Sequence, residues 1–252
     1  MNKRSLLRGA AAILATPLLP PGISFAVEAK RPSGVVELFT SQGCNSCPPA
    51  DAVLADLAAR GDIITLGYHV DYWDYLGWKD TLSNPKNTAR QYDYGKTFGI
   101  RSVYTPQAVI NGRTHVNGAH EAEVSGALAK LGQSGAGMTV GISVTRSGGS
   151  VIIDTEGAPG GVGDAHLVLV YFDPMRPIVI QHGENQGRTI DYVNPVSDIQ
   201  TAGMWHGKPA RYELPQSEIA KKGGCAVLLQ KVSKDGLPGA ILGAAVIQPG
   251  EN

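Results

Sequence analysis

Residues 35–51 read VVELFTSQGCNSCPPAD, and this stretch decides the fold of the first half of the chain. It opens with a run of apolar and β-branched residues, which is typical of a buried strand, and Ser41-Gln42-Gly43 then predicts a loop. Two cysteines follow, and the second is succeeded by Pro48 and Pro49, which a helix tolerates only in its first turn. The stretch therefore predicts a strand, a loop and a helix that starts at the cysteines.

The pattern after the cysteines extends this unit. The helix is predicted to run to Arg60, because apolar residues recur at helical spacing, and Asp51 lies where a negative charge favours the helix dipole. An apolar run at 63–70 predicts a parallel partner strand with a right-handed crossover. Asn84 as cap and Pro85 as first residue predict a second helix that runs to Phe98.

A hairpin and a third helix complete the first half. Residues 107–110 and 113–116 are short strand-like runs, and Asn111-Gly112 between them is the strongest short-range signal for a hairpin. Residues 121–131 then carry apolar side chains on one helical face. The order strand, helix, strand, helix, hairpin, helix predicts an α/β domain over residues 33–132.

The second half of the chain has a different pattern. From about residue 132 glycines interrupt strand-like runs, and helical periods are few. The candidate strands are residues 140–145, 151–155, 166–172, 178–181, 226–232 and 240–247. This pattern predicts a β-rich, sandwich-like accessory domain over residues 136–250.

The first 26 residues are predicted to be a signal peptide. Lys3, Arg4 and Arg8 precede an apolar run at 9–19, and small residues then lead to a cleavage point after Ala26. Export would place the mature protein in the periplasm or outside the cell. No other stretch reaches the roughly 18 apolar residues of a membrane span, so none is expected after the signal is removed.

Charge and composition exclude several partners. Lys plus Arg and Asp plus Glu each total 22, so the formal net charge is zero and no long-range field favours nucleic acid. The chain has 252 residues and is 42% hydrophobic, which is enough to build a real core. We expect neither a nucleic acid partner nor a bound cofactor.

A Cys-x-x-Cys pair at the start of a helix, after a buried strand, resembles the redox motif of thioredoxins. Phe98-Gly99-Ile100-Arg101, Thr105-Pro106 and Ile110-Asn111-Gly112 resemble the thioredoxin run that leads into a cis-proline opposite the cysteines. The resemblance spans residues 35–131. It implies a thioredoxin-like fold for the first domain and a cis peptide bond before Pro106.

The chain as a whole also resembles an exported, thioredoxin-like family classed as domain of unknown function 1223. The segments that carry this resemblance are VELFTSQGCNSCPPAD at 36–51, YHVDYWD at 68–74, RSVYTPQ at 101–107 and GENQGR at 183–188. They cover nearly all of the mature chain. The resemblance implies a fold rather than a substrate.

The chemistry expected of this motif begins with a thiolate. A cysteine at a helix N-terminus can have a pKa well below the free value near 8.5, so we assign Cys44 as the exposed attacking nucleophile. Cys47 is then the more buried, resolving thiol. Pro106 would present its neighbouring backbone to an extended substrate peptide. Protein thiols or disulfides are the predicted substrates, with a redox partner that the sequence does not identify.

Other residues invite comparison with thioredoxin. Glu37 corresponds to the buried acid of thioredoxins if one residue is inserted before Cys44, and it is otherwise a partly exposed strand glutamate. Thr105 is similar to the threonine before the cis-proline in disulfide isomerases of the same fold. Gly43 stands where thioredoxin has tryptophan, and Asn45-Ser46 replaces its Gly-Pro, so no redox potential carries over.

Two alternatives to a redox enzyme stay open. One is a binding module, which would hold copper through Cys44, Cys47 and His69, or recognise a protein without disulfide turnover. The other is an inert disulfide, which exported proteins form readily although so short a loop removes little unfolded-state entropy. Cys225 lies in a predicted core strand and is expected to be an inert buried thiol.

Overall fold

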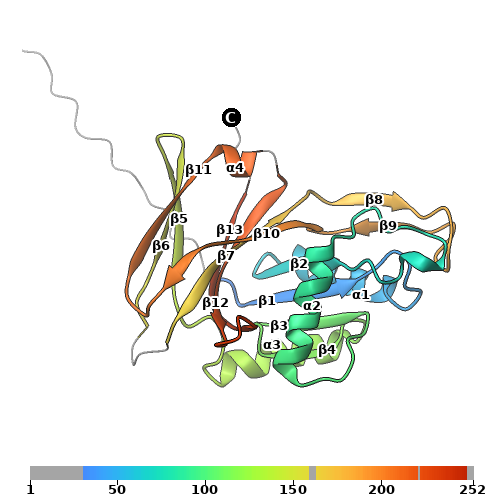
Figure 1. The fold of residues 1–252 in the computed structure, drawn as a ribbon, viewed down its shortest axis with the longest axis horizontal. Coiled ribbons are helices and arrows are strands. Elements are labelled where there is room, and N and C mark those ends of the chain that lie inside the picture. The colour runs from blue at the N-terminus through green and yellow to red at the C-terminus, as the bar shows by residue number, and fades with distance from the viewer. Residues whose placement is uncertain (1–30, 159–162, 221, 249–252) are drawn as a thin grey trace, which may run out of the picture.

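The computed structural model describes residues 31–158, 163–220 and 222–248, so the predicted signal peptide lies outside the described residues. The helices are α1 (Pro48–Ala59), α2 (Pro85–Phe98), α3 (Glu121–Gln133) and α4 (Ser217–Ala220), with a 3-10 helix η1 at Asp74–Leu76. The strands are β1 (Gly34–Thr40), β2 (Ile63–His69), β3 (Gln107–Ile110), β4 (Thr114–Asn117), β5 (Ile142–Ser147), β6 (Ser150–Thr155), β7 (Ala165–Phe172), β8 (Arg176–Val179), β9 (Thr189–Tyr192), β10 (Val196–Trp205), β11 (Ala210–Pro215), β12 (Gly224–Val232) and β13 (Pro238–Ile247). The fold is mixed α/β with several sheets (Figure 1).

The first half of the chain forms one four-stranded sheet in the order β2-β1-β3-β4. β1 and β2 are parallel, as the strand-helix-strand pattern predicts, whereas β3 runs antiparallel to β1 and β4. Asn111 and Gly112 have φ of 50° and 61° between β3 and β4. Both residues accept positive φ at low cost, and the predicted hairpin is confirmed.

The second half builds two further sheets, in the orders β10-β7-β12-β13 and β11-β6-β5, and a separate β8-β9 hairpin. The two sheets share a core in which Ile153 of β6 joins Leu167 of β7, Leu229 of β12 and the buried Trp205. They lie side by side on the left of Figure 1. The second half is therefore rich in strands, as the sequence pattern predicts, and its two larger sheets share one core.

The two halves meet through a continuous apolar core. Val36 and Leu38 of β1 point toward α1 and α3, while Val35 and Phe39 point to the opposite face of the sheet. On that face they join a cluster that includes Val170 of β7, so the second half covers one side of the first sheet. The helices α1 and α3 cover the other side. The domain boundary expected near residue 132 stays a prediction.

The first helix begins four residues later than Cys44, the first of the cysteines at which the sequence predicts its start. Its first residue is Pro48, and Cys47 is the N-cap rather than a helical residue. Cys44 and Cys47 form a separate turn, in which the Cys47 backbone N–H donates to the Cys44 carbonyl at 3.2 Å. Proline has no N–H to satisfy, so a first helical turn beginning at Pro48 leaves no donor unpaired there.

The second helix has the ends that its sequence predicts. The Asn84 side chain accepts a hydrogen bond from the Lys86 N–H, Pro85 is the first helical residue, and Gly99 ends the helix at positive φ. Among the described residues, no helix is long and apolar enough to cross a membrane.

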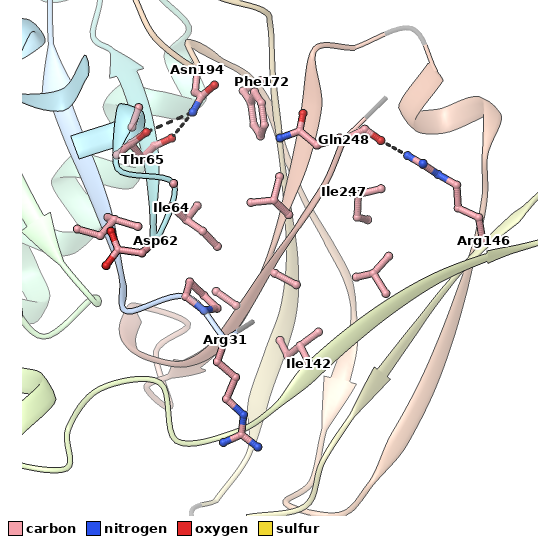
Figure 2. A pocket seen from close by; sticks show the side chains of 18 residues that line it. Arg31, Asp62, Ile64, Thr65, Ile142, Arg146, Phe172, Asn194, Ile247 and Gln248 are labelled. Atoms are coloured by element: carbon pink, nitrogen blue, oxygen red, sulfur yellow. Dashed lines mark hydrogen bonds between the residues drawn. The ribbon is translucent and has the colours of Figure 1, made fainter. Parts of the chain in front are cut away.

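A cavity of about 460 Å³ lies between the edge strand β2 and strand β13 (Figure 2). Ile64, Ile142 and Ile247 are among its aliphatic lining residues. Arg31 also lines it and is ion-paired with Glu156 at 2.7 Å. Because Cys44, Cys47 and Pro106 do not line it, the cavity is separate from the site that the sequence predicts.

Candidate active site

The two cysteines of the motif are joined as a disulfide immediately before α1. Their Cα atoms are 5.4 Å apart, and Asn45 and Ser46 between them are exposed at the surface. Ser46 Oγ lies 3.4 Å from Cys44 Sγ. The turn therefore presents its two polar residues outward and its two sulfur atoms inward.

Both cysteines are buried, which corrects the expectation of an exposed Cys44. Their exposed fractions are 2% for Cys44 and 0% for Cys47. Trp73, in the loop after β2, packs against Gly43, where a Cβ atom would lie only 3.0 Å from the Trp73 Cβ. Sequence reasoning placed Cys44 by its position alone and could not foresee this covering loop.

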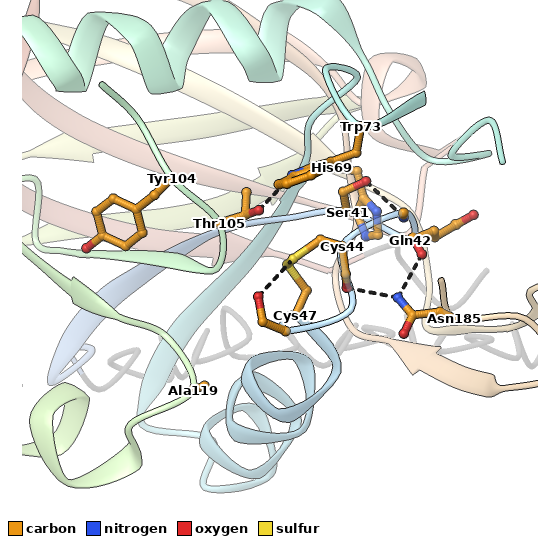
Figure 3. The surroundings of a disulfide bond; sticks show 12 residues. Ser41, Gln42, Cys44, Cys47, His69, Trp73, Tyr104, Thr105, Ala119 and Asn185 are labelled. Carbon is orange, nitrogen blue, oxygen red and sulfur yellow. Dashed lines mark hydrogen bonds between the residues drawn. A yellow bond between two sulfur atoms is a disulfide. The ribbon is translucent and has the colours of Figure 1, made fainter. Parts of the chain in front are cut away.

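Asn185 holds the cysteine turn from the second half of the chain (Figure 3). Its side-chain Nδ2 donates to the carbonyl of Gln42 at 3.0 Å and to that of Cys44 at 2.8 Å. The residue is 1% exposed and lies between β8 and β9. The GENQGR segment was recognised in the sequence, but nothing local in it indicated a contact with the cysteines.

The segment before β3 lies on another side of the disulfide (Figure 3). The Thr105–Pro106 peptide bond is cis, as predicted. Trp73 Nε1 donates to Thr105 Oγ1 at 2.8 Å, which ties this segment to the loop that covers Gly43. Within the described residues, the N–H and C=O of the half-buried Thr105 take part in no hydrogen bond. Pro106, in contrast, accepts from the Gly118 N–H at 3.1 Å.

A buried ion pair lies near the same end of the sheet. His69 Nδ1 is 2.8 Å from Asp80 Oδ2, and both side chains are almost wholly buried. Asp80 also accepts from the backbone N–H of Gln42 and of Leu82, each at 2.8 Å. Burial opposes both charges, but the pairing and hydrogen bonds outweigh it, so the pKa of Asp80 is lowered and that of His69 is raised.

Asp51 on α1 faces this pair. It is 5% exposed, and its Oδ2 atom has no hydrogen-bond partner among the described residues. Burial raises the pKa of Asp51 to about 7, an effect that the charge of His69 partly offsets and that of Asp80 reinforces. The ring of Tyr192, from β9, packs edge-on against His69 with centroids 4.6 Å apart.

Glu37 is neither beneath the disulfide nor partly exposed. It is fully buried on β1 and paired with Arg90 of α2, whose guanidinium lies 2.8 Å from Glu37 Oε1. Tyr94 donates to the other carboxylate oxygen. Its neighbours Val35 and Phe39 pack toward the second half of the chain, so Glu37 points away from α1. The expectation of a partly exposed strand glutamate is wrong.

The copper alternative gains no support from the part of the chain that the structure describes. Among the described residues, no three His, Cys, Asp or Glu side chains are grouped as metal ligands would be, although the sequence leaves copper at Cys44, Cys47 and His69 open.

Cys225 is a free, buried thiol on β12, and burial raises its pKa to about 12. It lies in the core between the two sheets of the second half, as an inert thiol would.

Comparisons with known proteins identify the family of this chain but assign no function to the site. A family model described as "Protein of unknown function (DUF1223)" matches residues 35–230. A crystal structure of an Agrobacterium tumefaciens protein is 44% identical, with a TM-score of 0.80 over 88% of this chain and 97% of that one. HBP35 of Porphyromonas gingivalis is 13% identical, with a TM-score of 0.57 over 86% of this chain and 75% of that one, a likeness in fold alone. No curated protein matches.

Proposed function

This chain belongs to the DUF1223 family of proteins of unknown function, and we propose that it is a periplasmic or secreted thiol-disulfide oxidoreductase. The redox pair is Cys44 and Cys47, and the domain that carries it, residues 33–132, is thioredoxin-like. Its substrates are protein thiols or disulfides. The β-rich second half is an accessory part that reaches the redox pair through Asn185.

The position of the disulfide carries the proposal. It lies directly before the N-terminus of α1, where the positive end of the helix dipole stabilises a thiolate on the reduced protein. Beside it, the N–H and C=O of Thr105 are free to pair with an extended substrate segment, next to Pro106. A purely stabilising disulfide needs neither feature, and a loop this short adds little stability.

The chemistry is a pair of thiol-disulfide exchanges. The Cys44 thiolate attacks one sulfur of a substrate disulfide, which forms a mixed disulfide and releases the other substrate sulfur as a thiolate. The Cys47 thiolate then attacks Cys44 Sγ, which forms the Cys44–Cys47 bond and releases the second substrate thiolate. Two electrons pass from the protein to the substrate. The same steps in reverse order oxidise a substrate dithiol.

Access to Cys44 requires movement of its cover. Trp73 packs against Gly43, next to the turn, and Asn185 donates to the Cys44 carbonyl within it. Both residues come from segments that are not part of α1 or β1. A substrate reaches the sulfur atom when these contacts open, so the cover restricts exchange to partners that displace it. In an oxidising compartment the closed, disulfide-bonded form is the one that persists.

Exchange with glutathione tests the proposal. The Cys47→Ala variant should react with oxidised glutathione and retain one glutathione on Cys44, which intact-mass measurement detects. Cys44→Ala is the matched control, because it keeps Cys47 and Cys225 and should retain none. The wild-type pair should equilibrate with glutathione at a potential above about −300 mV, the level below which structural disulfides lie. If no variant captures glutathione and the pair does not equilibrate, the disulfide is structural.

A further inference from the structure

The Asp51 carboxylate is an unusual group to find in a protein interior. Buried carboxylates normally accept hydrogen bonds at both oxygen atoms, because an unpaired buried charge is costly. Asp51 Oδ2 and the Thr40 hydroxyl both have no partner of normal hydrogen-bond geometry among the described residues, although the hydroxyl is near enough to lower the pKa of Asp51. By contrast, Asp80 accepts from His69, Gln42 and Leu82. The cluster therefore contains one satisfied carboxylate and one with an unused acceptor atom.

The position of Asp51 on α1 is one helical turn from the disulfide. Cys47 is the N-cap, and the Asp51 backbone N–H donates to the Cys47 carbonyl at 3.1 Å, which is one helical turn. Residues four apart lie on the same helix face with Cβ atoms about 5–6 Å apart. Both residues are buried on the face that packs against the sheet. A carboxylate at that distance reaches a thiol directly or through one water molecule.

We infer that Asp51 is the proton acceptor for the Cys47 thiol, and that His69 and Asp80 position it and balance its charge. This inference rests on the proposed function and deepens it, because it concerns the second exchange step at the same site. It also separates the two cysteines. Cys44 is the first cysteine of the turn and precedes the helix, whereas Cys47 is its N-cap and lies one helical turn from the buried Asp51.

The proposed step balances in protons and electrons. With a substrate sulfur bonded to Cys44, the proton of the Cys47 thiol passes to the Asp51 carboxylate. The resulting Cys47 thiolate attacks Cys44 Sγ, the Cys44–Cys47 bond forms, and the bond to substrate breaks. The substrate leaves as a thiolate, which takes a proton from solvent. In the oxidising direction protonated Asp51 returns its proton to Cys47.

The surroundings of Asp51 suit a group that gains and loses a proton near neutral pH. The groups that act on it are His69 from β2, Asp80 from the loop before α2 and Tyr192 from β9, with the Thr40 hydroxyl at the end of β1. Burial is the largest influence and raises its pKa to about 7. A proton acceptor is most effective when its pKa lies near the working pH.

Asp51 has a simpler explanation that the experiment must exclude. A negative charge in the first turn of a helix is favourable wherever it occurs, so Asp51 could serve α1 alone. If the Asp51 charge only stabilises the helix, its removal should change the reactions of both cysteines, because it would weaken the turn that holds them. A proton acceptor for Cys47 affects only the second exchange step.

Stopped-flow reaction of the fully reduced protein with dithiobis-nitrobenzoate separates the two steps. The first released nitrothiobenzoate reports attack by Cys44, and the second reports attack by Cys47 on the mixed disulfide. In Asp51→Asn the second release should slow about 100-fold at pH 7, a typical loss for a proton acceptor, while the first release stays within about twofold. The pH profile of the second release in Asp51→Asn should shift to a midpoint near 8.5, the ordinary pKa of a thiol.

Two further variants complete the test. Asp56→Asn removes an exposed carboxylate from the same helix and should change neither release. Asp51→Glu keeps an acid and should restore most of the second release, which also covers the case in which Asp51→Asn does not fold. Equal slowing of both releases, or an unchanged second release in Asp51→Asn, overturns the inference. A wild-type protein that gives no first release contradicts the proposed function itself.

Discussion

Two buried acidic clusters lie on opposite faces of the same sheet, and they are built in opposite ways. On the face toward the second half, Glu37 is bonded to Arg90 and Tyr94, and Gln230 joins both of those partners. On the face toward α1, Asp51 keeps an oxygen atom without a partner. The first cluster uses every charge in bonding, whereas the second leaves one carboxylate free for proton exchange.

This difference assigns the two clusters different tasks. A fully paired buried carboxylate loses heavily if it gains a proton, so it is suited to holding elements in place. Glu37 on β1, Arg90 on α2 and Gln230 on β12 connect the two halves of the chain. A buried carboxylate without such partners accepts a proton readily, and Asp51 lies one turn from the disulfide. Buried charge alone does not identify a reactive site. Under the proposed function, the unused acceptor atom beside the Cys44–Cys47 disulfide does.

The largest expected effect comes from breaking the fully paired cluster. Arg90→Met should destabilise the protein by about 3–5 kcal/mol, because it leaves the Glu37 carboxylate buried without its cation. Urea unfolding measures this loss. The control is Arg60→Met, which removes an exposed partner of Asp62 and should cost less than about 1 kcal/mol. Equal losses in the two variants would show that the buried pair is no more important than a surface pair.

The second effect is a dependence of folding stability on pH, which we expect from the Asp51 cluster and not from the Glu37 cluster. The unfolded carboxyl loses its proton near pH 4, but the folded one keeps it up to about pH 7. Folding stability should therefore fall by up to about 4 kcal/mol as the pH rises from 4 to 7, and then level off. Asp51→Asn should lack this fall.

Unfolding of the oxidised protein at several pH values tests that expectation. His69 has a raised pKa, so its contribution is complete below its unfolded pKa and is lost as the pH rises through its folded value. Most of that loss is also present in Asp51→Asn, because Asp80 raises the pKa of His69 more than Asp51 does, so the difference between the two curves reports mainly on Asp51. Glu37→Gln makes the matched change in the other cluster and serves as the control. It should lower stability at neutral pH by about 3 kcal/mol, because it leaves the Arg90 cation without its carboxylate partner. Parallel curves for wild type and Asp51→Asn would show that Asp51 has an ordinary pKa.

Local sequence signals predicted most of the sheet that carries the site. Asn84-Pro85 marked the start of α2, and Asn111-Gly112 marked the β3–β4 hairpin, because each signal acts through backbone chemistry within a few residues. The motif likewise located Cys44 and Cys47. The start of α1 was misplaced because Cys47 caps the helix without a side-chain hydrogen bond, so its sequence carries no capping signal.

Several strands of the second half could not be predicted. Only the two end residues of β10 are buried, and the strand has two register shifts against β7, so it lacks the alternating pattern of a half-buried strand. β9 is only four residues long. These strands form because β7 and β8 offer them backbone partners, and such pairing leaves little trace in the sequence of the strand itself.

The rest of the site depends on long-range contacts. Asp80 reaches Gln42 across 38 residues of sequence, and Asn185 reaches Cys44 across 141. Asp51 was predicted only as a favourable charge in the first helical turn. Its proximity to His69 follows from the alignment of β2 with β1, in which His69 is level with Thr40. No motif records these relations, because each depends on how separate elements pack.

The smallest expected effect comes from the most closely matched pair of variants, because the same Tyr→Phe change can be made in each cluster. Tyr94 donates to Glu37 and accepts from Gln230, so Tyr94→Phe removes hydrogen bonds within a charged network and should cost about 1.5–3 kcal/mol. Tyr192 is buried against His69, but its hydroxyl has no partner among the described residues. Tyr192→Phe should therefore leave stability unchanged within about 0.5 kcal/mol or raise it, since no hydrogen bond is lost and a buried polar atom is removed. Urea unfolding of both variants at pH 7 gives the comparison directly. A loss in Tyr192→Phe as large as that in Tyr94→Phe would mean that its hydroxyl has a partner, and the contrast between a saturated and an unsaturated cluster would then be wrong.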